Sequence, residues 1–335
     1  MPTPGSDGAS EARGAARWRE ALPVLLALGV IVLLAGPSFL GAYWLRVLCN
    51  IYLYAVLAQG INIMAGYTGY PAFGNVVFFG IGGYCTGVFM VKLQAPFAAG
   101  LLAAMVACPL LVLLLGPALL RLKGHYFAIA TLGLNEAIKE FVANASGLTG
   151  GGMGLALPLP PGGVAANAVK FYYLFLGVLL ASTWITWELG RRNLGLACRA
   201  IRDNETKAEA TGIHTTRSKT AAWMISATMT GAVGSINAYW MAYIDPPTVF
   251  DMTIAVKSFV IFLLGGAGTV LGPVIGAVFV ELLATLTWSN LLNWHLGAMG
   301  LLIMMVIMVF PSGFAAAARN APSPSRLFAR MRRRG

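Results

Sequence analysis

The sequence predicts an all-α protein that crosses a membrane about ten times. Of its 335 residues, 58% are hydrophobic and only 10% are charged, whereas a soluble domain averages roughly 25% charged residues. Several apolar runs reach the ~20 residues that a helix needs to cross about 30 Å of hydrocarbon. The four cysteines and three histidines are scattered along the chain. Their spacing predicts free thiols and no metal site.

The chain divides into three parts by composition. Residues 1–20 are a charged tail rich in glycine and alanine, which we expect to be disordered and cytoplasmic. The transmembrane domain is expected over residues 21–312, and a basic cytoplasmic tail over residues 313–335. The predicted membrane segments, some of them short or broken, are 21–40, 45–66, 66–84, 96–119, 126–144, 171–187, 221–243, 253–265, 273–286 and 296–310.

The basic residues predict the orientation of the chain. They gather in both tails and in residues 190–220, and lysine and arginine favour the cytoplasmic side of a membrane. We therefore expect both termini and this polar segment inside the cell. The net charge of +11 reports orientation and lipid contact, and it predicts no nucleic-acid-binding face.

Polar side chains occur inside the predicted membrane segments. Gln59 and Asn62 are three residues apart on one helical face, where they either bond to neighbouring helices or line a solute path. Glu136 lies ~17 Å into its helix, near the middle of the bilayer. An ionisable group there is a functional candidate, and the alternative is a local ion pair with Lys139 at i+3.

Two glycine-rich stretches interrupt the apolar segments, GYTGYPAFGNVVFFGIGGY at residues 66–84 and LLGGAGTVLGPVIGA at residues 263–277. Broken backbone is tolerated in a membrane where it lines a cavity or packs against other helices. The glycine spacing of the first stretch weakly echoes that of the second, as an internal repeat would. Lys257 and Glu281 flank the second stretch, and we expect them to pair, because an unpaired charge in lipid is costly.

The most polar stretch is residues 190–220, GRRNLGLACRAIRDNETKAEATGIHTTRSKT, which holds seven basic residues and three acidic ones. Residues 194–210 are mostly good helix formers, and Gly212 follows as a C-cap would. We predict a short amphipathic helix with an apolar side formed by Ala200, Ile201 and Ala208. Its charged side suits the polar rim of a docking surface. The alternative is a solvated loop whose arginines only set orientation.

Several motifs resemble one family of transporters. Residues 208–213, AEATGI, resemble the Glu-Ala-Ala…Gly signature of ABC importer permeases. The run RAIRDNETKAEATGI, residues 199–213, is similar to the coupling loop of the LivM/LivH-type branched-chain amino-acid permeases. Both glycine-rich stretches, and TLGLNEAIKEF at residues 131–141, also resemble that family. The chain departs from it at Tyr70-Pro71-Ala72, where the family has Gln-Leu-Ser, and at Asn75, where it has His. These departures leave the substrate open.

The resemblance implies the permease subunit of an ATP-driven importer in a bacterial inner membrane, for branched-chain or related amino acids. The implied partners are a second permease, identical or different, two ABC ATPases that bind the ATP, and a periplasmic substrate-binding protein. The residues expected at the ATPase contact are Arg199, Arg202, Ala208, Glu209, Ala210 and Gly212. The residues expected along the solute path are Gln59, Asn62, Thr68, Gly69, Asn75, Glu136, Gly265, Gly266, Gly268 and Thr269.

The sequence predicts a transport subunit and no enzyme. It has no phosphate-binding loop and no nucleophile motif, so we expect no cofactor of its own and ATP hydrolysis on separate subunits. Two alternatives stay open at this point. One is a permease for urea or short amides. The other is a self-sufficient secondary transporter or channel, which would have no need for an amphipathic docking helix.

Overall fold

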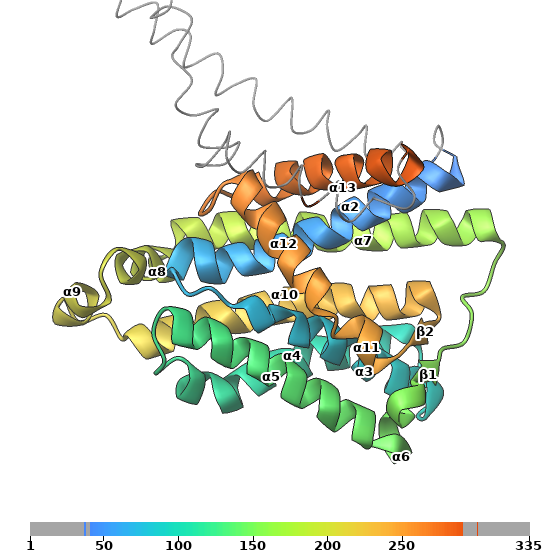
Figure 1. Cartoon of the computed structure of the whole chain (residues 1–335), viewed down its shortest axis with the longest axis horizontal. Coiled ribbons are helices and arrows are strands. Elements are labelled where there is room, and N and C mark those ends of the chain that lie inside the picture. The colour runs from blue at the N-terminus through green and yellow to red at the C-terminus, as the bar shows by residue number, and fades with distance from the viewer. Residues whose placement is uncertain (1–36, 38–40, 291–299, 301–335) are drawn as a thin grey trace, which may run out of the picture.

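The computed structural model describes residues 41–290, together with the isolated residues 37 and 300, and this part of the chain is an elongated bundle of helices (Figure 1). The elements in chain order are α2 (Ala42–Ile61), η1 (Asn62–Thr68), η2 (Phe73–Asn75), α3 (Val76–Val91), α4 (Phe97–Leu119), α5 (His125–Asn144), α6 (Ser146–Thr149), η3 (Gly151–Met153), β1 (Leu155–Ala156), α7 (Val164–Arg191), α8 (Asn193–Asp203), α9 (Glu205–Ala210), α10 (Thr215–Met241), β2 (Tyr243–Ile244), α11 (Pro246–Val249), α12 (Met252–Gly265) and α13 (Gly272–Asn290).

Five helical segments of the described part are long and apolar enough to cross a membrane, namely Ala42–Thr68, Phe73–Val91, Phe97–Leu119, Val164–Arg191 and Pro246–Gly265. A shorter apolar helix covers Gly272–Leu286. Helices α5 and α10 are also long but more polar. The predicted all-α membrane class is therefore confirmed, whereas the count of about ten spans stays a prediction. Segments 21–40 and 296–310 and both predicted tails lie outside the described residues.

Helix α10 lies at the centre of the bundle and packs against α2, α3 and α4. Glycines let these helices approach one another closely. A Cβ on Gly82 of α3 would collide with the carbonyl of Gly231 in α10, and a Cβ on Gly231 would collide with the thiol of Cys108 in α4. Small residues at such crossings are typical of membrane helices, whose association depends on close van der Waals packing.

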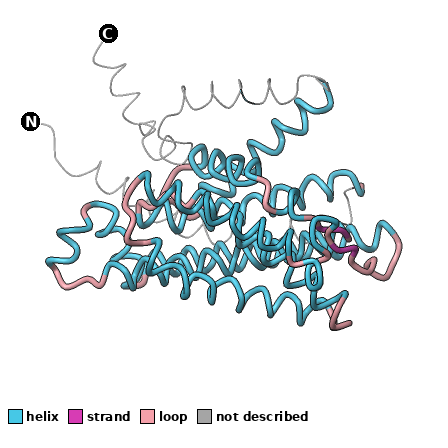
Figure 2. The backbone as a smooth tube through the Cα atoms, turned by 60° about the horizontal axis from the view of Figure 1, so that its bottom comes forward, coloured by secondary structure: helices cyan, strands magenta, loops and turns pink. Residues whose placement is uncertain are grey.

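The two ends of the bundle carry different structures. At one end β1 and β2 form a short antiparallel pair in which Leu155 lies opposite Ile244, and α6 lies at the same end (Figure 1). Figure 2 shows this strand pair in magenta beside the loops of that end. Helices α8 and α9 project from the opposite end (Figure 1). Because α7 runs from the strand end to α8, the predicted polar segment lies at the opposite end from the strands.

Residues 193–210 form two helices, α8 and α9, where the sequence predicted one. The break is Asn204, whose backbone is extended and whose side chain accepts a hydrogen bond from the backbone N–H of Lys207 (3.0 Å). Asparagine favours such a cap because its side chain competes with helical backbone bonds. The predicted helix stop at Gly212 is confirmed. Its φ is +88°, and the N–H groups of Gly212 and Ile213 bond back to the carbonyls of Glu209 and Ala208, as in a Schellman motif.

Candidate functional site

The two glycine-rich stretches of the sequence meet in space. Helix α2 runs into the π-helix η1, and a Cβ on Gly66 in η1 would lie only 2.7 Å from the backbone nitrogen of Gly268. The Asn62 side chain fastens the two stretches together. Its Nδ2 donates to the carbonyl of Thr269 (2.8 Å), and its Oδ1 accepts from the N–H of Gly268 (2.8 Å). We name Asn62, Gly66, Gly268 and Thr269 the glycine junction. π-Helical segments are frequent at functional sites.

Helix α8 is bound directly to the glycine junction. The Arg202 Nη1 donates to the carbonyl of Gly66 (2.6 Å), and a Cβ on Gly268 would lie 3.0 Å from the same nitrogen. Arg199, one turn earlier, places its guanidinium 5.2 Å from the centre of the Tyr67 ring. A displacement of α8 therefore acts on the point where the membrane helix is irregular.

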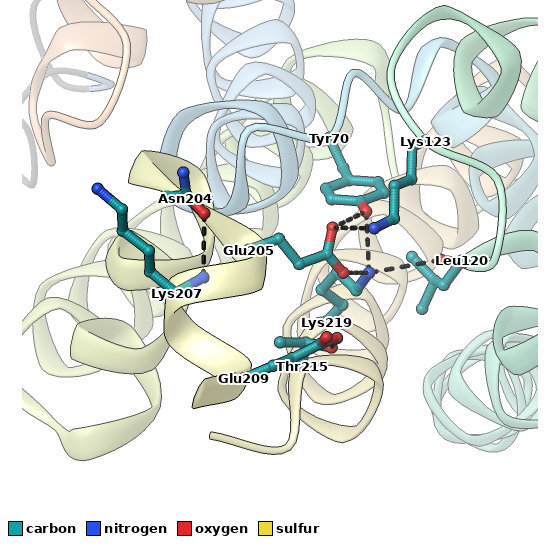
Figure 3. A network of polar contacts seen from close by, with 9 residues as sticks. All are labelled: Tyr70, Leu120, Lys123, Asn204, Glu205, Lys207, Glu209, Thr215 and Lys219. Carbon is teal, nitrogen blue, oxygen red and sulfur yellow. Dashed lines mark hydrogen bonds and ion pairs between the residues drawn. The ribbon is translucent and has the colours of Figure 1, made fainter. Parts of the chain in front are cut away.

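Helix α9 is tied to the bundle by a second set of polar contacts (Figure 3). The Glu205 carboxylate accepts from the Tyr70 hydroxyl (2.7 Å) and from Lys219 Nζ (2.6 Å). Lys219 also donates to the Tyr70 hydroxyl (2.9 Å) and to the carbonyl of Leu120 (3.4 Å), and Lys123 Nζ lies 3.8 Å from Glu205. We name these five residues the Glu205 network. It joins α9 to the loop after η1, to the end of α4 and to the start of α10.

The Glu205 network compensates a buried charge. Lys219 is only 1% exposed, and a buried ammonium group requires a partner. Burial raises the pKa of Glu205, but the hydrogen bonds from Lys219 and Tyr70 and the nearby positive charges outweigh it, so the pKa lies below its ordinary value. The pKa of Tyr70 is raised by its burial and by the adjacent Glu205, so the phenol stays protonated and can donate. The Glu205 carboxylate is therefore charged at neutral pH.

The predicted ATPase-contact residues fall into two groups. Glu209, Ala210 and Gly212 are exposed at the end of α9, and Glu209 accepts a hydrogen bond from the hydroxyl of Thr215 (2.8 Å). Ala208 is buried, as is Ile201 of the same predicted apolar side. The apolar side of α8 and α9 therefore packs against the rest of this chain, which removes its apolar surface from water. Arg199 and Arg202 also reach inward, as described above, and their role toward an ATPase stays a prediction.

Most of the predicted path residues are buried and hydrogen-bonded within the chain. Gln59 bonds with Thr183 (2.8 Å) and Thr186 (3.2 Å) of α7. Asn75 donates to Ser226 (3.0 Å) and Thr230 of α10. Of the two alternatives for Gln59 and Asn62, the structure therefore contains hydrogen bonds to neighbouring segments.

The remaining path candidates differ in exposure. The Thr68 hydroxyl donates to the carbonyl of Met64 (2.6 Å). Gly265 and Gly266 are buried, whereas Gly69 is exposed. Contact of any of these residues with a solute stays a prediction.

The charges of the membrane segments are paired in two places. Lys257 and Glu281 lie 2.5 Å apart, which confirms the predicted pair, and Lys257 also lies 4.0 Å from the centre of the Tyr54 ring. Glu136 and Lys139 form the local pair at 2.5 Å. The first pair is mostly buried between α12 and α13, while the Glu136 side chain is 52% exposed on the outside of α5.

Sequence reasoning missed the Glu205 network. Its members are far apart in the chain, since Tyr70 precedes Lys219 by 149 residues, and no periodicity connects them. The single signal was the tyrosine at position 70, where the resembling family has glutamine. An ion pair between two helices, such as that of Glu205 in α9 with Lys219 in α10, has no sequence signature of its own.

The fold and these contacts define a multi-pass helical membrane protein whose polar projection is bound to its broken helices. Residues 43–311 match the family model described as "Branched-chain amino acid transport system / permease component". The chain therefore belongs to this family of ABC transporter permeases, which are transport subunits and not enzymes. No solved structure matches the chain.

Three relatives show the range of the family. The high-affinity branched-chain amino acid transport system permease protein LivM of Salmonella typhimurium is 28% identical over 315 residues, covering 84% of this chain and 72% of LivM. The high-affinity branched-chain amino acid transport system permease protein LivH of Escherichia coli is 26% identical over 148 residues, covering 44% of this chain and 46% of LivH. The autoinducer 2 import system permease protein LsrC of Salmonella paratyphi B is 25% identical over 231 residues, covering 68% of this chain and 61% of LsrC.

Proposed function

We propose that this chain is one membrane subunit of an ATP-driven importer of branched-chain or related amino acids in a bacterial inner membrane. The observation that carries the proposal is the attachment of α8 and α9 to the first irregular stretch of the bundle, residues 66–84, and to α10. Arg202 bonds to the glycine junction, and Glu205 bonds to Tyr70 and Lys219. A soluble ATPase that moved α8 and α9 would thereby move the membrane helices.

The proposal includes the partners of such an importer. A second permease completes the membrane part, and a periplasmic binding protein delivers the solute at the strand end. Two ATPases bind the ATP, and one of them docks on the exposed end of α9. The LivM relative supports branched-chain amino acids as the substrate. The LsrC relative, named for autoinducer 2 import, shows that family membership alone does not fix the substrate.

The test of ATPase docking is Gly212→Val in the complete importer. Gly212 has φ +88°, a backbone conformation that valine adopts only with strain. We expect the variant to insert into the membrane, to lose the ATPase subunits on purification and to lose uptake. Arg191→Ala is the matched control, because Arg191 is exposed and stacks only on Trp187 at 4.5 Å within the described residues. Normal uptake by Gly212→Val would reject the docking assignment.

The substrate is tested by competition in proteoliposomes that contain all subunits. We expect unlabelled valine and isoleucine to compete with labelled leucine, and urea and acetamide to leave its uptake unchanged. Uptake by the purified chain alone would favour a self-sufficient transporter instead.

A further inference from the structure

The outer faces of α4 and α5 differ in chemistry. The exposed residues of α4 include Leu102, Val106, Leu110 and Leu114, each at least 60% exposed. Such a face is suited to hydrocarbon. The outer face of α5 carries Gly133, Glu136, Ala137 and Glu140 in its middle. Although both helices lie in the same bundle, the middle of the α5 face is charged where that of α4 is aliphatic. The exposed Ile129 and Phe141 lie before and after this charged part of α5.

The orientation of α5 is fixed by contacts on its inner side. The Thr131 hydroxyl accepts from the N–H of Gly74 (3.2 Å), and the Asn135 side chain donates to the carbonyl of Phe250 (3.0 Å). These bonds hold one face of the helix against η2 and α11. Rotation of α5 to bury Glu136 and Glu140 would break both bonds, so the two carboxylates stay on the outside.

The charges on this face are only partly neutralised by the residues that the structure describes. Lys139 pairs with Glu136 at 2.5 Å, but Glu140 has no ion-pair partner among the residues that the structure describes. Glu136 lies ~17 Å along a helix of about 30 Å, at the depth of the bilayer centre. Carboxylates at this depth face protein or a water-filled cavity and not lipid.

We propose that the outer face of α5, formed by Gly133, Glu136, Ala137 and Glu140, is the surface that meets the second permease chain. This inference rests on the proposed function and names one of its interfaces. The ATPases are assigned to α8 and α9 at one end, and the binding protein to the strand end, so neither reaches the middle of α5. Carboxylates at this depth face protein or water, and a permease is the one partner of the proposed importer with a membrane-embedded surface.

Two further observations support a permease as the occupant. A Cβ added at Gly133 meets nothing within 4 Å, and Ala137 follows it by one turn. Small residues four apart on an open face let a second membrane helix approach closely. LivM and LivH are two different permease proteins, and both are named for a high-affinity branched-chain amino acid transport system. This supports pairing of two permeases in this family.

The position of α5 relative to the irregular helices gives the interface a function. Gly74 packs so tightly on α5 that a Cβ there would overlap the carbonyl of Thr131, and Gly74 lies just beyond the loop that holds Tyr70. On the other side of η2, the ring of Phe73 stacks on Phe259 of α12 at 4.1 Å between centroids. A solute path between two permeases would therefore run beside the segments that α8 and α9 move.

The test is site-specific photo-crosslinking in membranes that contain the complete importer. p-Benzoylphenylalanine replaces Ala137 in one variant and Glu140 in a second variant. It replaces Leu110 of α4 in the control. After irradiation, we expect both α5 positions to give an adduct with a permease chain, either a second copy or a homologous permease, identified by mass spectrometry. Position 110 should give lipid adducts without a permease.

The outcomes separate the interface from the proposed function. Lipid adducts alone at positions 137 and 140, in an importer that still transports, would overturn the interface and leave the function standing. Adducts with the ATPase or the binding protein alone would also overturn it. A permease adduct in a complex that binds no ATPase would keep the interface and reject the importer. If the probe at position 137 blocks assembly, the result at position 140 decides.

Discussion

Replacement of Glu205 by glutamine tests whether the Glu205 network holds α9 to the bundle. The substitution keeps the size of the side chain but removes the charge that compensates Lys219, which is 2% exposed in its side chain. Removal of one partner of a buried ion pair costs about 3–5 kcal/mol. Because Glu205 is 15% exposed and the Tyr70 hydroxyl and the Leu120 carbonyl still accept from Lys219, we expect the low end, about 3 kcal/mol.

A double-mutant cycle separates the charge pair from the rest of the network. Lys219→Met removes the buried ammonium group. Glu205→Gln should therefore lower the stability much less in the Lys219→Met background than in the wild type. Tyr70→Phe removes a hydroxyl that donates to Glu205 and accepts from Lys219. Hydrogen bonds to charged groups contribute about 1.5–3 kcal/mol, so this variant should lie between the wild type and Glu205→Gln.

The assay is thermal unfolding of the reconstituted chain at neutral pH, compared with the stimulation of ATP hydrolysis by the loaded binding protein. Unfolding of membrane proteins is often irreversible, so the rates of unfolding are compared at one temperature. We expect Glu205→Gln to unfold faster and to bind the ATPases without stimulation. Wild-type stability of Glu205→Gln, or additive effects of the two substitutions, would refute the argument that Glu205 and Lys219 stabilise each other.

Three further predictions concern pH, the second ion pair and the packing of α3. The pKa of Glu205 is lowered below 4.5 in the folded chain, so its stabilisation is complete above that pH and is lost as pH falls through the lowered pKa. Unfolding rates of wild type and Glu205→Gln should therefore converge in acid. Neutralising both Lys257 and Glu281 should harm stability less than neutralising either, in a double-mutant cycle. Gly82→Ala should cost about 1–3 kcal/mol through overpacking, whereas Gly177→Ala, with open space around it, should leave the unfolding rate unchanged.

The sequence by itself determined the features that depend on single residues or near neighbours. Apolar length indicated membrane helices because transfer of each residue into hydrocarbon is a local property. Gly212 indicated the end of a helix because the left-handed conformation suits glycine. The Lys257–Glu281 pair was predictable because an unpaired charge in lipid is costly wherever its partner lies. These inferences needed no knowledge of how the helices pack.

The tertiary structure decided which side chains of distant segments meet. Arg202 bonds to a carbonyl 136 residues away, and Asn62 bonds to a loop 207 residues away, in contacts that no periodicity indicates. The same packing turned the apolar side of α8 and α9 inward and left Glu136 on the outside of α5. Hydropathy says whether a helix enters the membrane, but which face meets lipid, protein or water depends on the neighbours that cover it. That covering is set by how whole helices fit together.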